Sequence, residues 1–351
     1  EDLENWSASE ENPISYDYMN YKVCKTDFWG QGPCFLQQLA ILKNFDLENY
    51  NATSPEFVHL IVEATKLAFA DREAFYGDPN FIKIPKDILL SVEYNLKRSS
   101  IISDKASMEV IPGKIEGFGG PVIVRAKGKT DESFSKFDIG EPTIAKFDET
   151  KTSPLGTTSG DTTHFDIIDK WGNMVAATPS GGWLQSSPII PELGFCLSNR
   201  AQMFWLDENS PASLAPGKRP RTTLSPTLAL KDGEPYMVFG TPGGDQQDQW
   251  SLHLFLRHVH FNLNLQESID APGFNTAHFP NSFYPRETDI GSLFVESRFP
   301  EKTIKNLISK GHNLIIENEW SLGRMTAATK EDKILKAAAN PRFMQGYAIG
   351  R

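Results

Sequence analysis

Apolar residues in the first third of the chain recur every three to four positions, which is the spacing of an amphipathic helix. The pattern predicts one helix around residues 35–42. A longer helix is predicted from Ser54, a good N-cap residue that is followed by Pro55 at the first helical position. Its apolar stripe runs from Phe57 to Ala68, and Gly77-Asp78-Pro79 indicates where it has ended.

After these helices the pattern changes twice. Residues 103–160 are polar and rich in turn-forming residues, and we expect an exposed linker there. Residues 164–178 alternate with period two on either side of a Trp-Gly-Asn turn, which predicts a β-hairpin. Further strands are expected at 194–199, 224–230 and 236–240, and helices at 247–261 and 301–310. Helices first and strands afterwards predict an α+β fold with helices packed on a sheet.

Composition narrows the class of protein. The 351 residues, 39% of them hydrophobic, are enough to bury one large core or two ordinary ones. A formal net charge of −10 does not suit a surface that neutralises phosphates, so we expect no nucleic-acid partner. No apolar run reaches the roughly 18 residues of a membrane span, and no span is expected. The first twenty residues show no secretory signal, which leaves the compartment open with the cytoplasm slightly favoured.

A candidate nucleophile lies where the polar segment meets the first strand of the hairpin, in G-D-T-T-H-F at 160–165. Taken alone, two threonines at a strand are more often structural. Their position directly after a dispensable linker, however, suits a self-processing N-terminal-nucleophile hydrolase. In such an enzyme the Thr162 hydroxyl attacks the carbonyl of Asp161, and the resulting ester is hydrolysed. The freed α-amino group, whose ordinary pKa is about 7.7 to 8, is then the general base for the same hydroxyl.

Two further segments have the chemistry to complete such a site. Between a predicted strand and a predicted helix, Gly240 to Gly244 would let backbone N–H groups approach a developing oxyanion without a Cβ in the way. Alone, that segment is more often a tight turn. At 217–227, the hydroxyls of Thr222-Thr223 precede a predicted strand and could bind an anionic substrate, with three cations nearby. A solvated basic loop is an equally good interpretation of this segment.

Together, these segments resemble the gamma-glutamyltransferases and their relatives among the N-terminal-nucleophile hydrolases. The motifs occur in that family's order, as T-T-H-F, D-K-W-G-N, K-R-P-R-T-T-L-S-P-T and G-T-P-G-G. Upstream, E-A-T-K-L-A-F-A-D-R-E and Y-G-D-P resemble the family's large subunit, so the likeness extends from about Gly30 onward. The resemblance implies a four-layer αββα sandwich. Residues 1–161 would be the C-terminal part of the large subunit and 162–351 the small subunit, associated after autocleavage as one composite domain.

The resemblance also implies a role for individual residues. Thr162 corresponds to the nucleophile, and Ser180 falls where the family has a Thr that orients the nucleophile's amino group. Thr222-Thr223 replace paired serines that bind the glutamyl α-carboxylate, and Gly243-Gly244 would supply the oxyanion hole. The implied reaction is hydrolysis or acyl transfer at a γ-glutamyl amide of a small-molecule substrate. It proceeds through an acyl-enzyme, and neither a cofactor nor a metal is implied.

Several positions depart from the family's pattern. Gly182 stands where the family has Asn, and Arg200 and Met203 stand where it has the Gln and Asp that hold the substrate's α-amino group. An Arg repels that ammonium, and a Met cannot pair with it. Arg200, with the cations of residues 218–221, would instead suit an acyl group that ends in a carboxylate without an amine, such as glutaryl. The N-terminal portion of the family's large subunit has no counterpart in this chain.

The sequence therefore leaves two alternatives to a γ-glutamyl enzyme. One is a glutaryl-type (dicarboxylyl) acylase, and the other is a non-catalytic binding protein that kept the fold. The histidines do not favour further chemistry. His258 and His260 point apart on a helix, which does not suit a metal site. His164 is expected to be structural, because a strand directs neighbouring side chains to opposite faces.

Overall fold

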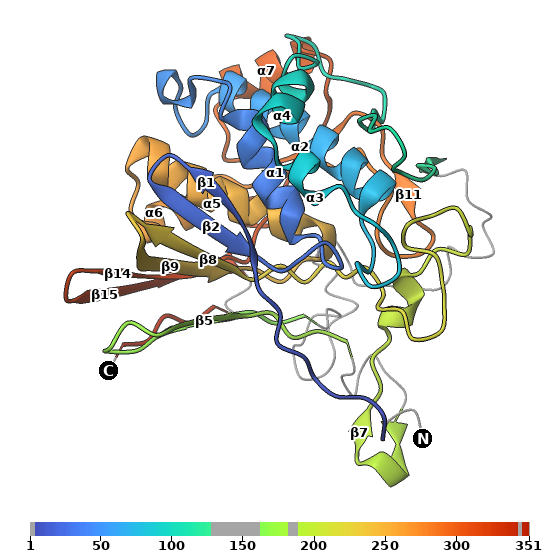
Figure 1. The fold of residues 1–351 in the computed structure, drawn as a ribbon. Coiled ribbons are helices and arrows are strands. Elements are labelled where there is room, and N and C mark those ends of the chain that lie inside the picture. Colours follow the sequence, from blue (N-terminus) through green and yellow to red (C-terminus); the bar gives the residue numbers. More distant parts are fainter. Residues whose placement is uncertain (1–3, 128–161, 182–188, 343–345, 351) are drawn as a thin grey trace.

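A six-stranded antiparallel sheet forms the centre of the fold (Figure 1). The computed structural model describes residues 4–127, 162–181, 189–342 and 346–350. The order of the strands in the sheet is β1 (Ile14–Tyr18), β2 (Tyr21–Lys25), β8 (Thr227–Lys231), β9 (Glu234–Gly240), β14 (Thr326–Glu331) and β15 (Ile334–Ala339). The sheet thus joins segments far apart in the sequence, because β2 pairs with β8 through Val23 and Ala229.

Three helices, α1 (Gly32–Leu42), α2 (Pro55–Phe75) and α5 (Gln247–Phe261), form a layer on one face of this sheet (Figure 1). Helix α2 begins as its sequence predicts, since the Ser54 hydroxyl accepts the Phe57 N–H at 3.3 Å. Buried rings join the layers. Phe239 of β9 stacks on Phe255 of α5 at 5.9 Å between ring centroids, and each such ring contributes about 1.5–3 kcal/mol by leaving water.

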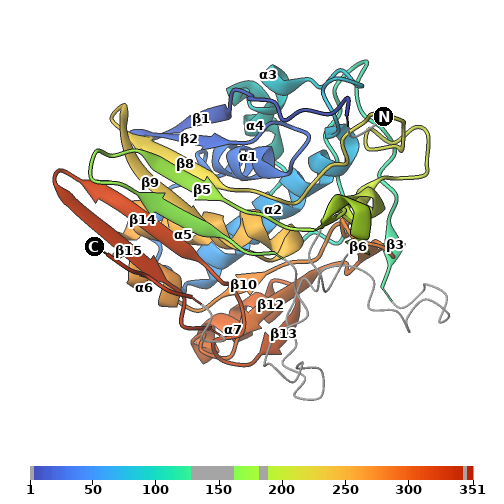
Figure 2. The same cartoon turned by 90° about the horizontal axis from the view of Figure 1, so that it is seen from below.

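The opposite face of the sheet carries the predicted hairpin, whose strands are β4 (Phe165–Ile168) and β5 (Met174–Ala177). Figure 2 shows it lying across β8, β9 and β14. The Asp169 carboxylate closes the turn, because it accepts the backbone N–H groups of Trp171 and Asn173 at 2.9 Å. Strand β9 is covered on both faces, so its second half, Tyr236 to Gly240, is continuously buried.

The other elements surround these layers. They comprise α3 (Lys86–Leu89), α4 (Val92–Ser99), α6 (Leu265–Asp270), α7 (Glu301–Ser309), the strands β3 (Arg125–Ala126), β6 (Ile189–Ile190), β7 (Phe195–Cys196), β10 (Phe274–Asn275), β11 (Glu287–Thr288), β12 (Ser292–Glu296) and β13 (Asn313–Glu317), and short 3-10 helices at Leu47–Asn49, Pro191–Leu193, Arg200–Met203 and Gly244–Gln246. Within the described ranges, no helix has both the length and the apolar character needed to cross a membrane.

The prediction of an exposed linker at 103–160 holds in part where the structure describes it, because none of residues 103–127 is buried, but this segment is attached to the rest of the fold. Residues 103–127 pack along the helical layer. The Gly113 N–H donates to the buried Asp71 carboxylate at 2.6 Å, and the Gly120 N–H donates to the Ala74 carbonyl at 2.8 Å. These bonds to α2 satisfy backbone groups that an isolated polar segment would leave to water. Residues 128–160 of the predicted linker lie outside the described ranges.

Two predicted strands are also shorter than expected. The strand expected at 194–199 is limited to β7, which pairs only with β6. The strand expected from residue 224 begins at Thr227, because the Ser225 hydroxyl and N–H are taken by Asp248 and Gln247 of α5. The β1–β2 hairpin was not predicted at all.

Candidate active site

Thr162 and Ser180 face each other across the open end of the β4–β5 hairpin. Phe165 pairs with Ala177, and the same register extended by three residues brings Thr162 opposite Ser180 as an isolated antiparallel bridge. The Thr162 Oγ1 atom lies 2.6 Å from Ser180 Oγ, within hydrogen-bond range. The Thr163 N–H also donates to the Pro179 carbonyl at 3.1 Å. The hairpin ladder therefore fixes the backbone on which the predicted nucleophile lies.

Arg200 approaches the same pair of hydroxyls from the 3-10 helix at Arg200–Met203. Its Nη2 atom donates a hydrogen bond to Ser180 Oγ. The guanidinium lies 5.6 Å from the centroid of the Phe283 ring. Gly181 is also close, since an added Cβ there would be only 3.0 Å from Arg200 Nε. Arg200 is thus buried beside the nucleophile, whereas Met203 is buried in the interior.

His164 connects the hairpin to the strand that leads to the glycine pair. Its imidazole lies between the Thr178 hydroxyl, at 2.7 Å from Nδ1, and the Asp166 carboxylate, at 3.0 Å from Nε2. The Asp166 carboxylate accepts in turn from the Thr326 hydroxyl at 2.7 Å. The ring rests against Gly240, where an added Cβ would be 2.3 Å from it. These contacts suit a structural role for His164, but not for the reason expected, because His164 is two residues from Thr162 and the alternation of faces separates only adjacent residues.

Gly243-Gly244 follow β9 and precede α5, as predicted. Both have positive φ, +133° and +54°, which favours glycine. Cβ atoms added here would lie 2.6 Å from the Trp250 ring and 3.0 Å from the Phe283 ring, so the backbone approaches both rings closely. Phe283 therefore lies against both Gly244 and Arg200. Phe283 thus links the turn of the glycine pair to Arg200, which in turn bonds Ser180.

Thr222-Thr223 lie on the buried chain just before β8. The Thr222 N–H donates to the Trp29 carbonyl at 3.0 Å, and its hydroxyl accepts the Leu224 N–H at 3.3 Å. The Thr223 hydroxyl is buried and has no hydrogen-bond partner among the described residues. Of the two hydroxyls, that of Thr223 is therefore the one with unused hydrogen-bonding capacity.

A buried charge cluster lies next to the glycine pair. Arg72 contacts Asp245 at 2.5 Å and Glu73 at 2.9 Å, and Arg221 contacts Glu73 at 2.8 Å. Burial alone would raise the pKa of Asp245, but the Arg72 guanidinium and hydrogen bonds from Ser282 hold that pKa below its ordinary value. Asp245 follows Gly244 directly, so these ion pairs anchor the turn that carries the glycine pair.

The cations at 218–221, which the sequence suggests could act together with Arg200, have partners of their own. The Lys218 ammonium donates to the Pro211 carbonyl at 2.9 Å, and Arg219 pairs with Asp78 at 3.0 Å. Arg221 belongs to the cluster described above. Each of these cations is already held by protein oxygens, because the segment is fastened to α2 and the loop after it. Gly182, the other predicted substrate-binding residue, lies outside the described ranges.

A cluster of potential metal ligands lies elsewhere in the fold. Buried His59, Glu63 and His312 have ligand atoms within 4.8 Å of one another. His59 Nδ1 bonds His312 Nε2 at 2.8 Å, and Lys66 pairs with Glu63 at 2.6 Å, so most of these atoms already have partners in the protein. His312 Nδ1 is buried and has no hydrogen-bond partner among the described residues.

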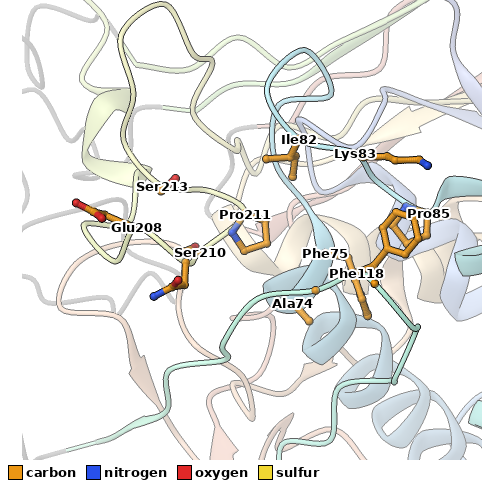
Figure 3. A pocket seen from close by; sticks show the side chains of 13 residues that line it. Ala74, Phe75, Ile82, Lys83, Pro85, Phe118, Glu208, Ser210, Pro211 and Ser213 are labelled. Carbon is orange, nitrogen blue, oxygen red and sulfur yellow. The ribbon is translucent and has the colours of Figure 1, made fainter.

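A cavity of about 620 Å³ lies at the C-terminal end of α2 (Figure 3). Its lining includes Phe75, Phe118, Lys83, Glu208 and Ser210. None of the predicted site residues lines it. We therefore do not place the reaction in this cavity.

Comparison with known proteins identifies the class. Among solved structures, the chain is similar to an LmbA variant with a TM-score of 0.84 and 48% identity, covering 100% of this chain and 57% of the other. It is also similar to the cephalosporin acylase of Bacillus halodurans, with a TM-score of 0.74 and 26% identity, covering 99% and 54%. The fold is that of the N-terminal-nucleophile hydrolases.

Sequence comparison then gives the family. The gamma-glutamyltranspeptidase family matches residues 1–350, and the chain belongs to that family. It is 28% identical over 313 residues to the glutathione hydrolase proenzyme of Bacillus subtilis subsp. natto. The matched region covers 89% of this chain and 48% of that protein. The resemblance inferred from the motifs is thereby confirmed. The chain spans about half the length of the curated relatives that it matches.

Proposed function

We propose that the protein is an autoprocessed amide hydrolase or acyltransferase that cleaves γ-glutamyl or related amide bonds, with Thr162 as its nucleophile. The observation that carries the proposal is the Thr162 hydroxyl, which lies 2.6 Å from Ser180 Oγ at the start of a hairpin packed on the central sheet. Membership of the family and the glycine pair at the end of β9 support the same reaction. A binding protein without turnover would not need these groups to be brought together.

The first reaction is cleavage of the chain before Thr162. The Thr162 Oγ1 attacks the carbonyl carbon of Asp161, the C–N bond breaks, and the nitrogen takes up the hydroxyl proton as an ester forms. Water then hydrolyses this ester to leave a carboxyl group on Asp161 and a free amino group on Thr162. The new amino group becomes the general base for the adjacent hydroxyl.

Turnover then repeats the same bond changes on an external amide. Thr162 Oγ1 attacks the acyl carbonyl, the amino group accepts the hydroxyl proton, and this proton passes to the leaving amine as the C–N bond breaks. Water, or another amine, attacks the acyl-enzyme in the second half of the cycle. Backbone N–H groups of Gly243-Gly244 would stabilise the oxyanion in both halves, since neither residue has a Cβ to block the approach.

The proposal extends to the organisation of the chain. Residues 1–161 would be the C-terminal part of the large subunit and residues 162–351 the small subunit. Pairing of β2 with β8 supports this, because strands from both pieces share one sheet and would hold the pieces together after cleavage. We propose that the full assembly is the αββα sandwich of the family. The helical layer, the six-stranded sheet and the hairpin layer would be three of its four layers.

The acyl group is the open part of the proposal. The buried guanidinium of Arg200 beside Ser180 disfavours a substrate ammonium at that position, because like charges repel strongly away from water. This favours a glutaryl-type acyl group as the second candidate. Thr223, whose buried hydroxyl has no partner among the described residues, would be the group that binds the acyl carboxylate. Thr222 and Gly182 are the other substrate-binding residues that we propose.

Intact mass of the purified full-length protein tests the proposal. Two polypeptides are expected, the smaller beginning at Thr162, and Thr162→Ala should remain one chain without activity. Thr163→Ala is the matched control, because its side chain is exposed and it should still be cleaved. Cleavage of the Thr162→Ala chain would remove this residue from the mechanism. Turnover of γ-glutamyl and glutaryl anilides by the cleaved protein then separates the two acyl classes.

A further inference from the structure

We propose that Arg200 acts on the nucleophile through Ser180, as a positioning residue that stabilises negative charge developing on Thr162 Oγ1. The inference rests on the proposed function and deepens it, because it assigns Arg200 to the nucleophile and not to the acyl group. It starts from three side chains in a row. Arg200 Nη2 donates to Ser180 Oγ, and Ser180 Oγ lies 2.6 Å from Thr162 Oγ1. We call this row the Arg200–Ser180–Thr162 relay.

The direction of the hydrogen bonds follows from the chemistry of the three groups. A guanidinium can only donate, so Ser180 Oγ accepts from Arg200. Ser180 keeps its own hydrogen, and Thr162 Oγ1 lies within its reach. When Thr162 gives up its proton during attack, only the Ser180 hydrogen can bridge the two oxygens. The bond therefore strengthens as charge develops on Thr162 Oγ1, and the adjacent cation polarises it further.

The burial of Arg200 favours this role over direct contact with a substrate. Its relative exposure is 7%. The guanidinium lies over the Phe283 ring, 5.6 Å from its centroid, and close to the backbone of Gly181. Gly181 has φ +72°, and an added Cβ would lie 3.0 Å from Arg200 Nε, so a side chain there would displace the arginine. The Arg200 N–H also donates to the Ser198 hydroxyl at 3.2 Å, which fixes the start of the 3-10 helix.

The relay is present in the continuous chain, before any cleavage, and this offers a decisive test. Autocleavage requires attack by Thr162 Oγ1 but involves no external acyl group. An arginine that only binds the carboxylate of a substrate would leave the rate of cleavage unchanged. An arginine that acts through Ser180 should accelerate cleavage and acylation alike.

The experiment measures the first-order rate of cleavage by intact mass for the wild-type chain, Arg200→Met and Arg200→Lys. We expect Arg200→Met to cleave about 10–100-fold more slowly, with KM for a glutaryl anilide within about twofold of the wild-type value. Arg200→Lys, which keeps the charge, should recover part of the rate. Arg125→Met removes an exposed arginine as the matched control and should cleave at the wild-type rate.

A second comparison tests whether the effect passes through Ser180. In a Ser180→Thr background, which retains the hydroxyl, the loss of Arg200 should still slow cleavage. In a Ser180→Ala background it should change the rate by less than about twofold, because coupled groups are not additive. Thermal unfolding of each variant identifies chains that fail to fold. If Arg200→Met does not fold, Arg200→Lys in the same backgrounds decides the question.

The outcomes separate the inference from the function on which it rests. A wild-type chain that neither cleaves nor turns over an anilide would overturn both. Cleavage of Arg200→Met at the wild-type rate, with KM for the glutaryl anilide raised tenfold or more, would overturn only the relay and assign Arg200 to the acyl carboxylate. An equal loss of rate in the Ser180→Ala and wild-type backgrounds would also overturn it, because Arg200 would then act without Ser180.

Discussion

The imidazole of His164 rests directly on the backbone of Gly240, so closely that an added Cβ would fall 2.3 Å from the ring. His164 is two residues after the proposed nucleophile, and Gly240 is three residues before Gly243. This contact therefore sets the distance between the hairpin that carries Thr162 and the turn that carries the glycine pair. It depends on a glycine for its lack of a side chain, since the φ of Gly240 is not among the positive ones.

Gly240→Ala should therefore disturb both stability and cleavage. The new methyl group displaces the His164 ring from Thr178 and Asp166, and overpacking of this kind costs about 1–3 kcal/mol. We expect a comparable fall in the free energy of unfolding, measured in urea, and cleavage at least about tenfold slower as the two segments separate. Gly350→Ala, in open space, is the control. Cleavage at the wild-type rate would show that this contact does not position the nucleophile.

A second prediction concerns the buried pair of Lys25 and Asp248, which lie 2.9 Å apart and join β2 to α5. Burial lowers the pKa of Lys25 and raises the pKa of Asp248, so each charge depends on the other. Lys25→Met should lower the free energy of unfolding by about 3–5 kcal/mol, because it leaves the carboxylate without its cation.

The exposed pair of Lys97 and Glu93 offers the matched comparison for that measurement. Lys97→Met should change the free energy of unfolding far less than Lys25→Met does, because water screens both members of the exposed pair. A double variant that makes both members of the buried pair apolar should recover part of the loss, since neither charge is then left alone. Equal effects of Lys25→Met and Lys97→Met in urea unfolding would contradict the prediction.

Local patterns predicted some elements and not others, for physical reasons. Helix α2 was found from its cap at Ser54, and α5 from residues 247–261, because apolar periodicity and caps are local signals. The β4–β5 hairpin was found because its alternation and turn lie within fifteen residues. The β1–β2 hairpin was missed, since its strands gain their burial from α1 and from β8, about 200 residues later.

In the candidate site, too, some residues could be predicted from the sequence and others could not. The order of the motifs was enough to predict Thr162, Ser180 and the glycine pair. The position of Arg200 against Ser180 depends on a 3-10 helix twenty residues further on, and on space left by Gly181. The ion pair of Arg219 with Asp78 spans 141 residues and cannot be seen in the pattern of either segment. Contacts between distant segments of the chain therefore determine which cations are already paired with protein oxygens.

Thr222 and Thr223 should respond differently to the loss of their hydroxyls. The Thr222 hydroxyl accepts the Leu224 N–H, so Thr222→Val should cost about 1 kcal/mol of stability. The Thr223 hydroxyl is buried without a partner among the described residues, so Thr223→Val should cost nothing or stabilise the protein slightly. If Thr223 binds the acyl carboxylate, the same variant should raise KM about 10–100-fold. A destabilised Thr223→Val with unchanged KM would assign that hydroxyl to the fold alone.

A final prediction concerns the stability of the protein in mild acid, which His278 should limit. Its Nδ1 accepts the Gly291 N–H at 2.6 Å, and its Nε2 lies 3.1 Å from the Glu109 carbonyl. The ring is therefore neutral, with its hydrogen on Nε2, and protonation of Nδ1 would break the bond to Gly291. Burial, together with the nearby Lys66 ammonium, lowers the pKa of His278 from 6.5 to about 4.

The sign of the effect follows from linkage between protonation and folding. Between pH 6.5 and about 4 the unfolded chain binds a proton at this histidine and the folded chain does not. The contribution of neutral His278 to the free energy of unfolding is complete above pH 6.5. It falls by about 1.4 kcal/mol per pH unit as the pH decreases through this window. Urea unfolding at a series of pH values measures the slope. His278→Asn, which keeps an acceptor near Gly291 but cannot titrate, should reduce the slope by that amount, and an unchanged slope would show that His278 does not control it.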